Sequence, residues 1–125
     1  MSGSSVPLSV LFDRNVPRPL RQHLSGHAVR TTDDEGWYAL TNGDLLAAAE
    51  HAGFNVLVTG DRNLRYQQNL SGRRLALVVL SNPAWPVVRV NLPRIIAAVD
   101  HAMPGGYEEV ILPRPPLRRH PPPMA

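Results

Sequence analysis

The chain has no cysteine and no lysine among its 125 residues. Without cysteine there is no disulfide framework, no thiolate zinc site and no thiol nucleophile. This absence fits a reducing compartment, so a cytoplasmic location is expected. Without lysine, a receiver-type signalling domain is disfavoured, because that class relies on a lysine near the end of a late strand.

Several motifs and segments are also missing. The sequence has no G-x-x-x-x-G-K-S/T phosphate loop, no G-x-G-x-x-G after a strand and no G-x-S-x-G nucleophile elbow. The longest apolar stretches, such as Leu75–Leu80, are too short to span a bilayer. Residues 1–5 lack a basic segment followed by an apolar one, so no secretory signal and no membrane association are expected.

Positive charge is concentrated at one end of the chain. All thirteen basic residues are arginine, and three of them lie in the last thirteen residues, where there is no acid. Residues 1–112 therefore hold ten arginines against ten acids. The body of the chain has no bulk positive field of the kind that marks many nucleic-acid-binding proteins, although arginine binds phosphate well wherever one is placed locally.

The apolar pattern predicts strands alternating with helices. We expect strands at residues 8–12, 27–31, 54–59, 75–80 and 108–112, the last at a sheet edge. Helices are expected from Pro17 to about Leu24, over Leu45–Ala52 up to Gly53, and over Leu92–Met103. Residues 62–70 are expected to form a short helix or turn, and residues 81–86 a loop.

This order predicts an α/β fold: a central, mainly parallel sheet of four to five strands with helices on its faces, in a three-layer α/β/α, Rossmann-like arrangement. One domain is expected over residues 1–112. Residues 113–125 contain six of the thirteen prolines, so we expect an extended or disordered Pro/Arg-rich tail.

Three acids are predicted to meet at one edge of the sheet. Asp13 follows the first strand, Asp61 follows the third, and Asp44 lies in the first turn of the second helix. In such folds ligands bind at the carboxyl ends of the strands. Gathered carboxylates suit Mg²⁺ or Mn²⁺, which can acidify a water and neutralise a phosphate. The three are therefore predicted as metal ligands and catalytic residues, with Asn63 orienting a water or phosphate.

Structural interpretations of the same residues stay open. Asp44 completes a capping box with Thr41, and Asp13 or Asp61 could cap the helix that follows it. Asn63 could merely complete a turn. The acids at residues 33–35 are more typical of a solvated loop, although that loop is expected near the same edge.

Polar residues suited to a single-stranded nucleic acid backbone follow the first and third strands. The predicted RNA-binding residues are Asn15, Arg62, Arg65, Gln67 and Arg73, with a solvated loop and helix face as the alternative. Trp37 and Trp85 lie in predicted loops, either as lids on the core or as platforms for bases.

Motifs along residues 8–111 resemble the PIN-like family of small bacterial proteins related to VapC-type toxin nucleases. The matching pieces are Leu11-Phe-Asp-Arg-Asn-Val-Pro17, Leu20 with Gly26-His-Ala-Val29, Asn42-Gly-Asp-Leu-Leu46, Val56-Leu-Val-Thr-Gly-Asp-Arg-Asn-Leu64, Tyr66-Gln-Gln-Asn-Leu70 and Trp85-Pro86. The resemblance implies a PIN-like fold and a Mg²⁺- or Mn²⁺-dependent endoribonuclease acting on single-stranded RNA. It also implies a small DNA-binding antitoxin as partner, with a homodimer as a further form of assembly.

Carried over to this sequence, Asp13 matches the first acid of the family and Asp61 the acid after the third strand. Asp44 matches the middle acid best, with Asn42 and Glu35 as alternatives. Relatives often have Asp-x-Asp where this chain has Asp61-Arg-Asn63, which removes one anionic ligand. The alternative function is therefore a PIN-like scaffold that binds protein or RNA without cleaving it.

Overall fold

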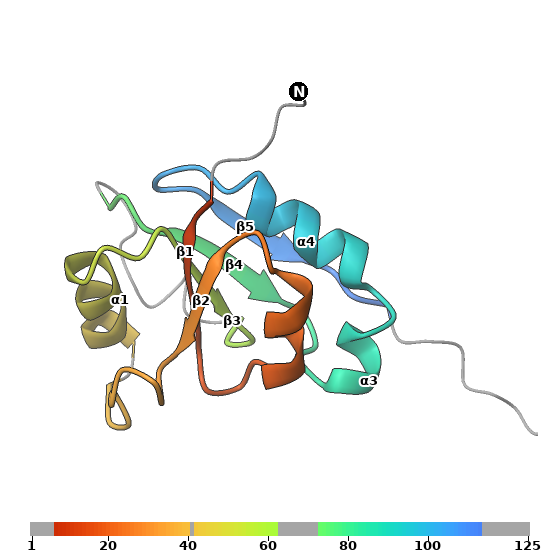
Figure 1. Ribbon diagram of the computed structural model, residues 1–125, viewed down its shortest axis with the longest axis horizontal. Coiled ribbons are helices and arrows are strands. Elements are labelled where there is room, and N and C mark those ends of the chain that lie inside the picture. Colours follow the sequence, from red (N-terminus) through yellow and green to blue (C-terminus); the bar gives the residue numbers. More distant parts are fainter. Residues whose placement is uncertain (1–6, 41, 63–72, 114–125) are drawn as a thin grey trace, which may run out of the picture.

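The fold, described by a computed structural model for residues 7–40, 42–62 and 73–113, is built on a five-stranded parallel sheet (Figure 1). The strands are β1 (Ser9–Phe12), β2 (Ala28–Thr31), β3 (Val56–Thr59), β4 (Ala76–Leu80) and β5 (Tyr107–Val110). The helical elements are the 3₁₀ helix η1 (Arg18–His23), and α1 (Asn42–His51), α3 (Trp85–Val88) and α4 (Leu92–Asp100). The expected α/β fold with a mainly parallel sheet of four to five strands is confirmed.

The sheet order is β2-β1-β3-β4-β5, and every neighbouring pair is parallel. The chain moves outward from β1 to β2, then returns across β1 to begin β3. The strand order therefore reverses between β1 and β3. Open α/β sheets bind ligands at such a switch point, just outside the carboxyl ends of the two strands. The predicted edge position of the last strand is confirmed by β5.

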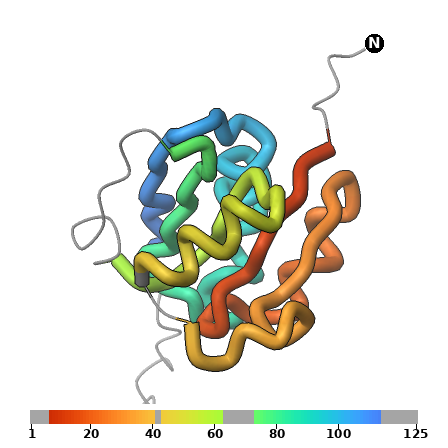
Figure 2. The backbone as a smooth tube through the Cα atoms, turned by 90° about the vertical axis from the view of Figure 1, so that its left-hand side faces the viewer, coloured from red at the N-terminus to blue at the C-terminus, as the bar shows by residue number. Residues whose placement is uncertain are grey.

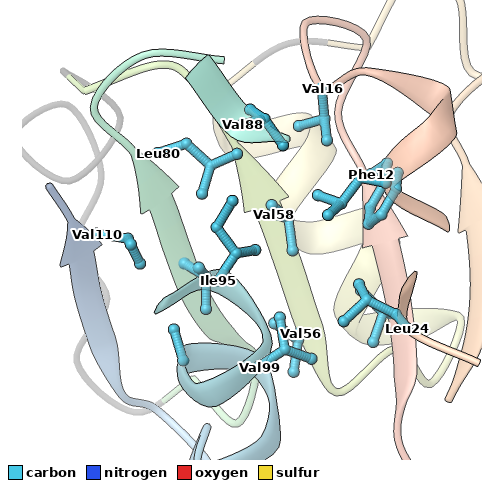
Figure 3. Packing of buried hydrophobic residues seen from close by; sticks show 14 of the residues in the cluster. Phe12, Val16, Leu24, Val56, Val58, Leu80, Val88, Ile95, Val99 and Val110 are labelled. Carbon is cyan, nitrogen blue, oxygen red and sulfur yellow. The ribbon is translucent and has the colours of Figure 1, made fainter. Parts of the chain in front are cut away.

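Alternating side chains of the strands form two apolar clusters, one on each face of the sheet. Val10 and Phe12 of β1 face η1, α3 and α4, whereas Leu11 faces α1. Figure 3 shows the first cluster, in which Phe12, Val58 and Ile95 pack together with residues of α3. Figure 2, turned by 90° about the vertical axis from Figure 1, shows α1 (yellow) in front of the strands. Helices thus cover both faces, which explains why β3 and β4 are buried at every position.

Helix α1 ends where the sequence predicts. Leu45, Leu46 and Ala49 are buried against the sheet. Gly53 has a φ of 90°, its N–H donates to Glu50 O (3.1 Å), and the next N–H donates to Ala49 O (3.0 Å). These two bonds are a Schellman motif, which needs a residue in the left-handed region. The predicted cap Thr41 lies outside the described residues.

Three predicted elements differ from the structure. The segment after Pro17 is a 3₁₀ helix of six residues, and no side chain caps its start. Residues 85 and 86, expected to end a loop, begin the short helix α3, in which Pro86 occupies the first turn. Helix α4 ends at Asp100, and Met103 is 69% exposed beyond it, so it is not part of the apolar face.

The described chain ends at a contact with the helical layer. The buried side chain of Asn91 donates to Val87 O (2.8 Å) and to Pro113 O (3.1 Å). The rest of the predicted tail lies outside the described residues. Within the described ranges, no helix is long and apolar enough to cross a membrane.

Candidate active site at the carboxyl edge of the sheet

Asp13 lies at the point where β1 meets β3. Its backbone N–H donates to Val58 O (2.9 Å), so the β1–β3 pairing continues one residue beyond β1. The side chain is half-buried, and its Oδ1 accepts a hydrogen bond from the N–H of Arg14 (2.7 Å). The strand pairing therefore fixes the backbone that carries this carboxylate at the switch point of the sheet.

Thr59, the last residue of β3, connects Asp13 to Asp61. Its hydroxyl is buried, donates to Asp13 Oδ2 (2.7 Å) and accepts from the N–H of Asp61 (3.0 Å). A hydroxyl has only one proton to donate, and here the carboxylate receives it. One side chain thus orients the Asp13 carboxylate and holds the backbone of Asp61 beside it.

Three loops approach one another closely next to these acids. The N–H of Gly60 donates to Asn15 Oδ1 (2.8 Å), which ties the loop after β3 to the loop after β1. A Cβ at Gly60 would stand 2.6 Å from Cγ of Pro83, in the loop after β4. Only glycine fits there without moving the proline ring. Asn15, predicted to bind RNA, therefore also fixes the loop that carries Asp61.

Asp44 is not joined to this pair. It is exposed in the first turn of α1, as predicted, and the connection from β2 starts that helix at the same edge. Over the described ranges, no three His, Cys, Asp or Glu side chains are placed to hold one metal ion. Magnesium commonly binds through one or two carboxylates plus water and substrate phosphates. Asp13 and Asp61, which Thr59 links, are two carboxylates of the kind that such a site uses.

The acidic loop at residues 33–35 is held by arginines. Asp33 pairs with Arg18 (2.7 Å). The neighbouring acids Asp34 and Glu35 pair with Arg21 and Arg30. Glu35 raises the pKa of Arg30, chiefly through their hydrogen bond. Because its carboxylate is already paired with a cation, Glu35 is a poorer candidate for the middle acid than Asp44.

The predicted RNA-binding residues do not share one surface. Arg62 follows β3 and pairs with Glu109 of β5 (2.9 Å). Arg73 precedes β4 at the opposite, amino-terminal edge, where it pairs with Glu50 (3.3 Å). Arg73 is therefore placed away from Asp13. Asn63, Arg65 and Gln67 lie outside the described residues.

The sequence did not reveal a hollow that opens beside Asp13. It has a volume of about 150 Å³ and is lined by Asp13, Arg14, Thr32, Trp37, Tyr38 and Leu40. The adjacent aromatic pair in an otherwise polar loop was the available signal. Two larger hollows, of about 200 and 310 Å³, lie toward the amino-terminal ends of the strands, away from Asp13 and Asp61.

Both tryptophans pack against the core. Trp37 is half-buried and meets Phe54 edge-to-face, with ring centroids 6.2 Å apart. Trp85 packs against the cluster beneath α3 and lies 6.2 Å from the ring of His23. These contacts favour the lid interpretation for Trp85, whereas Trp37 also lines the hollow beside Asp13.

Comparisons of the chain with protein-family models, with curated proteins and with solved structures found no match. The PIN-like resemblance rests on the motifs quoted above and stays a prediction.

Proposed function

We propose that the chain is a PIN-like, Mg²⁺- or Mn²⁺-dependent endoribonuclease that hydrolyses phosphodiester bonds in single-stranded RNA. The observation that carries the proposal is the pairing of Asp13 and Asp61 through Thr59 at the switch point of the parallel sheet. One buried hydroxyl that bonds the carboxylate of Asp13 and the backbone of Asp61, at the usual ligand-binding edge, supports a divalent-cation site there.

Each residue has a stated role in this proposal. A divalent ion held by Asp13 and Asp61 would acidify a water and offset the charge that develops on the phosphate. Thr59 holds the Asp13 carboxylate in one orientation. Asp44, exposed at the start of α1, positions the attacking water, and Asn63 assists in orienting the phosphate.

The biological setting follows from the resemblance alone. We propose a cytoplasmic toxin of a type II toxin–antitoxin pair, inhibited by a small DNA-binding antitoxin. The body of the chain carries as many arginines as acids, so RNA has to be held by local contacts rather than by a general positive field.

The proposal is tested by cleavage of a panel of unstructured RNAs with Mg²⁺ or Mn²⁺. Asp13→Asn should lower the rate by more than about a hundredfold, since even outer-shell changes around a metal cost 10- to 100-fold. Asn keeps one oxygen that can accept from Thr59 but loses the second acceptor, which the N–H of Arg14 uses, so the melting temperature should fall only slightly.

Asp33→Asn is the matched control, because Asp33 is an acid of the neighbouring loop that pairs with Arg18. It should cleave RNA like the unmodified chain. Absence of cleavage across the panel with both metals, or equal rates for Asp13→Asn and the unmodified chain, would refute the nuclease.

The second candidate is a PIN-like scaffold that binds RNA or protein without cutting. It is favoured by one observation: over the described ranges, no three potential ligand side chains converge on a metal position. Calorimetry separates the two candidates. Binding of Mn²⁺ that Asp61→Asn removes supports the nuclease, whereas no binding at millimolar Mn²⁺ supports the scaffold.

A further inference from the structure

The hollow beside Asp13 lies between the carboxyl ends of β1 and β2 and the aromatic segment that precedes α1. Its lining includes the polar residues Asp13, Arg14 and Thr32 and the aromatic residues Trp37 and Tyr38. Its volume of about 150 Å³ is too small for a helix or a folded peptide segment. It suits one planar ring with its edge near polar atoms.

The two aromatic residues of the lining differ in exposure and in their ring contacts. Trp37 is half-buried and held edge-to-face against Phe54, with an interplanar angle of 78°. Tyr38 is 64% exposed, one of few large apolar side chains with that exposure in the described part of the chain. A fixed ring beside an exposed one provides an aromatic surface for stacking that the fold itself does not cover.

Arg14 links this surface to the acids. Its guanidinium donates to the backbone carbonyl of Tyr38, and its own N–H donates to Asp13. An arginine side chain has five N–H donors, so donors remain for a phosphate oxygen. Arg14 therefore brings a cation to the aromatic segment, while its backbone is bonded to a proposed metal ligand.

We infer that this hollow binds one unpaired base of the RNA, next to the scissile phosphodiester, with the flanking phosphate on Arg14. The inference rests on the proposed ribonuclease function, because that function supplies the RNA. Stacking on aromatic side chains accepts every base, so the subsite would add affinity with little sequence preference.

The test measures binding of a fluorescently labelled RNA hexamer by anisotropy, in an Asp61→Asn background with EDTA so that no cleavage occurs. Tyr38→Ala should weaken binding about tenfold, a loss typical of removing one stacking ring. Tyr38→Phe keeps the ring and should bind like the parent. Val90→Ala, at another half-exposed apolar residue, is the matched control and should also bind like the parent.

A second measurement identifies the base as the occupant. With Trp85→Phe, Trp37 is the only tryptophan, and the hexamer should quench its fluorescence, whereas a fully abasic hexamer should not. Equal binding by Tyr38→Ala and the parent, equal quenching by both oligomers, or no measurable RNA binding would overturn the subsite. Base-dependent quenching by a chain that cleaves no RNA would retain the subsite and refute the nuclease. RNA cleavage without base-dependent binding would retain the nuclease and refute the subsite.

Discussion

At the amino-terminal edge of the sheet, Glu50 accepts hydrogen bonds from the side chain of Arg73 and the backbone of Arg74. At the carboxyl-terminal edge, Asp13 accepts from the hydroxyl of Thr59 and the backbone of Arg14. The first carboxylate is neutralised by a cation within the fold. Asp13 forms no ion pair with the described residues, whereas Glu50 pairs with Arg73.

His27, at the amino-terminal edge, is likewise bonded to partners within the fold. Its buried ring accepts from the N–H of Leu8 at Nδ1 (2.9 Å) and contacts Asp100 at Nε2 (2.7 Å). With Nδ1 occupied as an acceptor, the neutral ring donates from Nε2 to the carboxylate. The ring thereby joins β1, β2 and the end of α4. Glu50 and His27 at the amino-terminal edge are thus each bonded to a residue that can carry the opposite charge, whereas the bonds described for Asp13 come from neutral donors.

The largest effect on stability is expected at His27. His27→Ala should lower the free energy of unfolding by about 3 kcal/mol, because it opens a cavity and leaves the N–H of Leu8 without its acceptor. Chemical denaturation measures this change. His51→Ala, at an exposed histidine on α1, is the control and should stay within about 0.5 kcal/mol. If His27→Ala leaves the free energy of unfolding nearly unchanged, the hydrogen bonds of His27 do not stabilise this edge of the sheet.

Thr59→Val tests the carboxyl edge. Valine has nearly the same shape but no hydroxyl, so Asp13 loses its donor and Asp61 N–H its acceptor. We expect RNA cleavage to fall by about 10- to 100-fold, with about 1 kcal/mol of lost stability. Thr59→Ser keeps the hydroxyl and should retain most of the rate. If the valine variant cleaves at the parent rate, Thr59 does not position the acids.

Gly60→Ala probes the close approach of the loops. The added Cβ would meet the ring of Pro83 at 2.6 Å, which should cost about 1–2 kcal/mol and displace the loop that carries Asp61. Denaturation and cleavage are both measured. Combining the change with Pro83→Ala should restore part of the loss, because the clashing ring atoms are removed. Strictly additive losses would show that the contact is not the cause.

The smallest effect is expected from Asp34. A hydrogen bond from the backbone N–H of Thr31, together with Arg21, lowers its pKa below the ordinary value of 3.8. A lowered folded pKa gives stability that is present above the unfolded pKa and lost as pH falls through the folded one. Asp34→Asn should therefore reduce the acid-induced loss in the free energy of unfolding below about pH 4. The difference should be at most ~1 kcal/mol, because the pair is so exposed. Denaturation at several acidic pH values measures it. If the variant and the parent lose stability equally at acidic pH, the lowered pKa of Asp34 is wrong.

Much of the fold was predictable because its signals are local. The apolar runs at 54–59 and 75–80 predict buried strands, and Gly53 predicts the end of α1; both are confirmed. Two helical elements were not predicted in their observed form. The segment after Pro17 is a 3₁₀ helix, and Trp85 and Pro86, expected in a loop, begin α3. Proline in a first turn is compatible with a helix, because the N–H groups there have no intrahelical acceptor.

The candidate site was predictable only in outline. Strand order placed Asp13 and Asp61 at one edge in advance, and the hydrogen bonds to Thr59 agree with that placement. Nothing in the sequence indicated that Thr59 would join them. The separation of Arg73 from this edge was equally hidden, because its partner Glu50 lies 23 residues away.

The sequence by itself determined the alternation of strands and helices, because periodicity, glycine and short-range hydrogen bonding act within a few residues. It also determined which acids follow which strands. The tertiary structure alone decided that the order reverses between β1 and β3, which loops touch at Gly60, and which acids are paired with arginine. Those features depend on side chains distant in sequence meeting in space, and only the packed sheet brings them together.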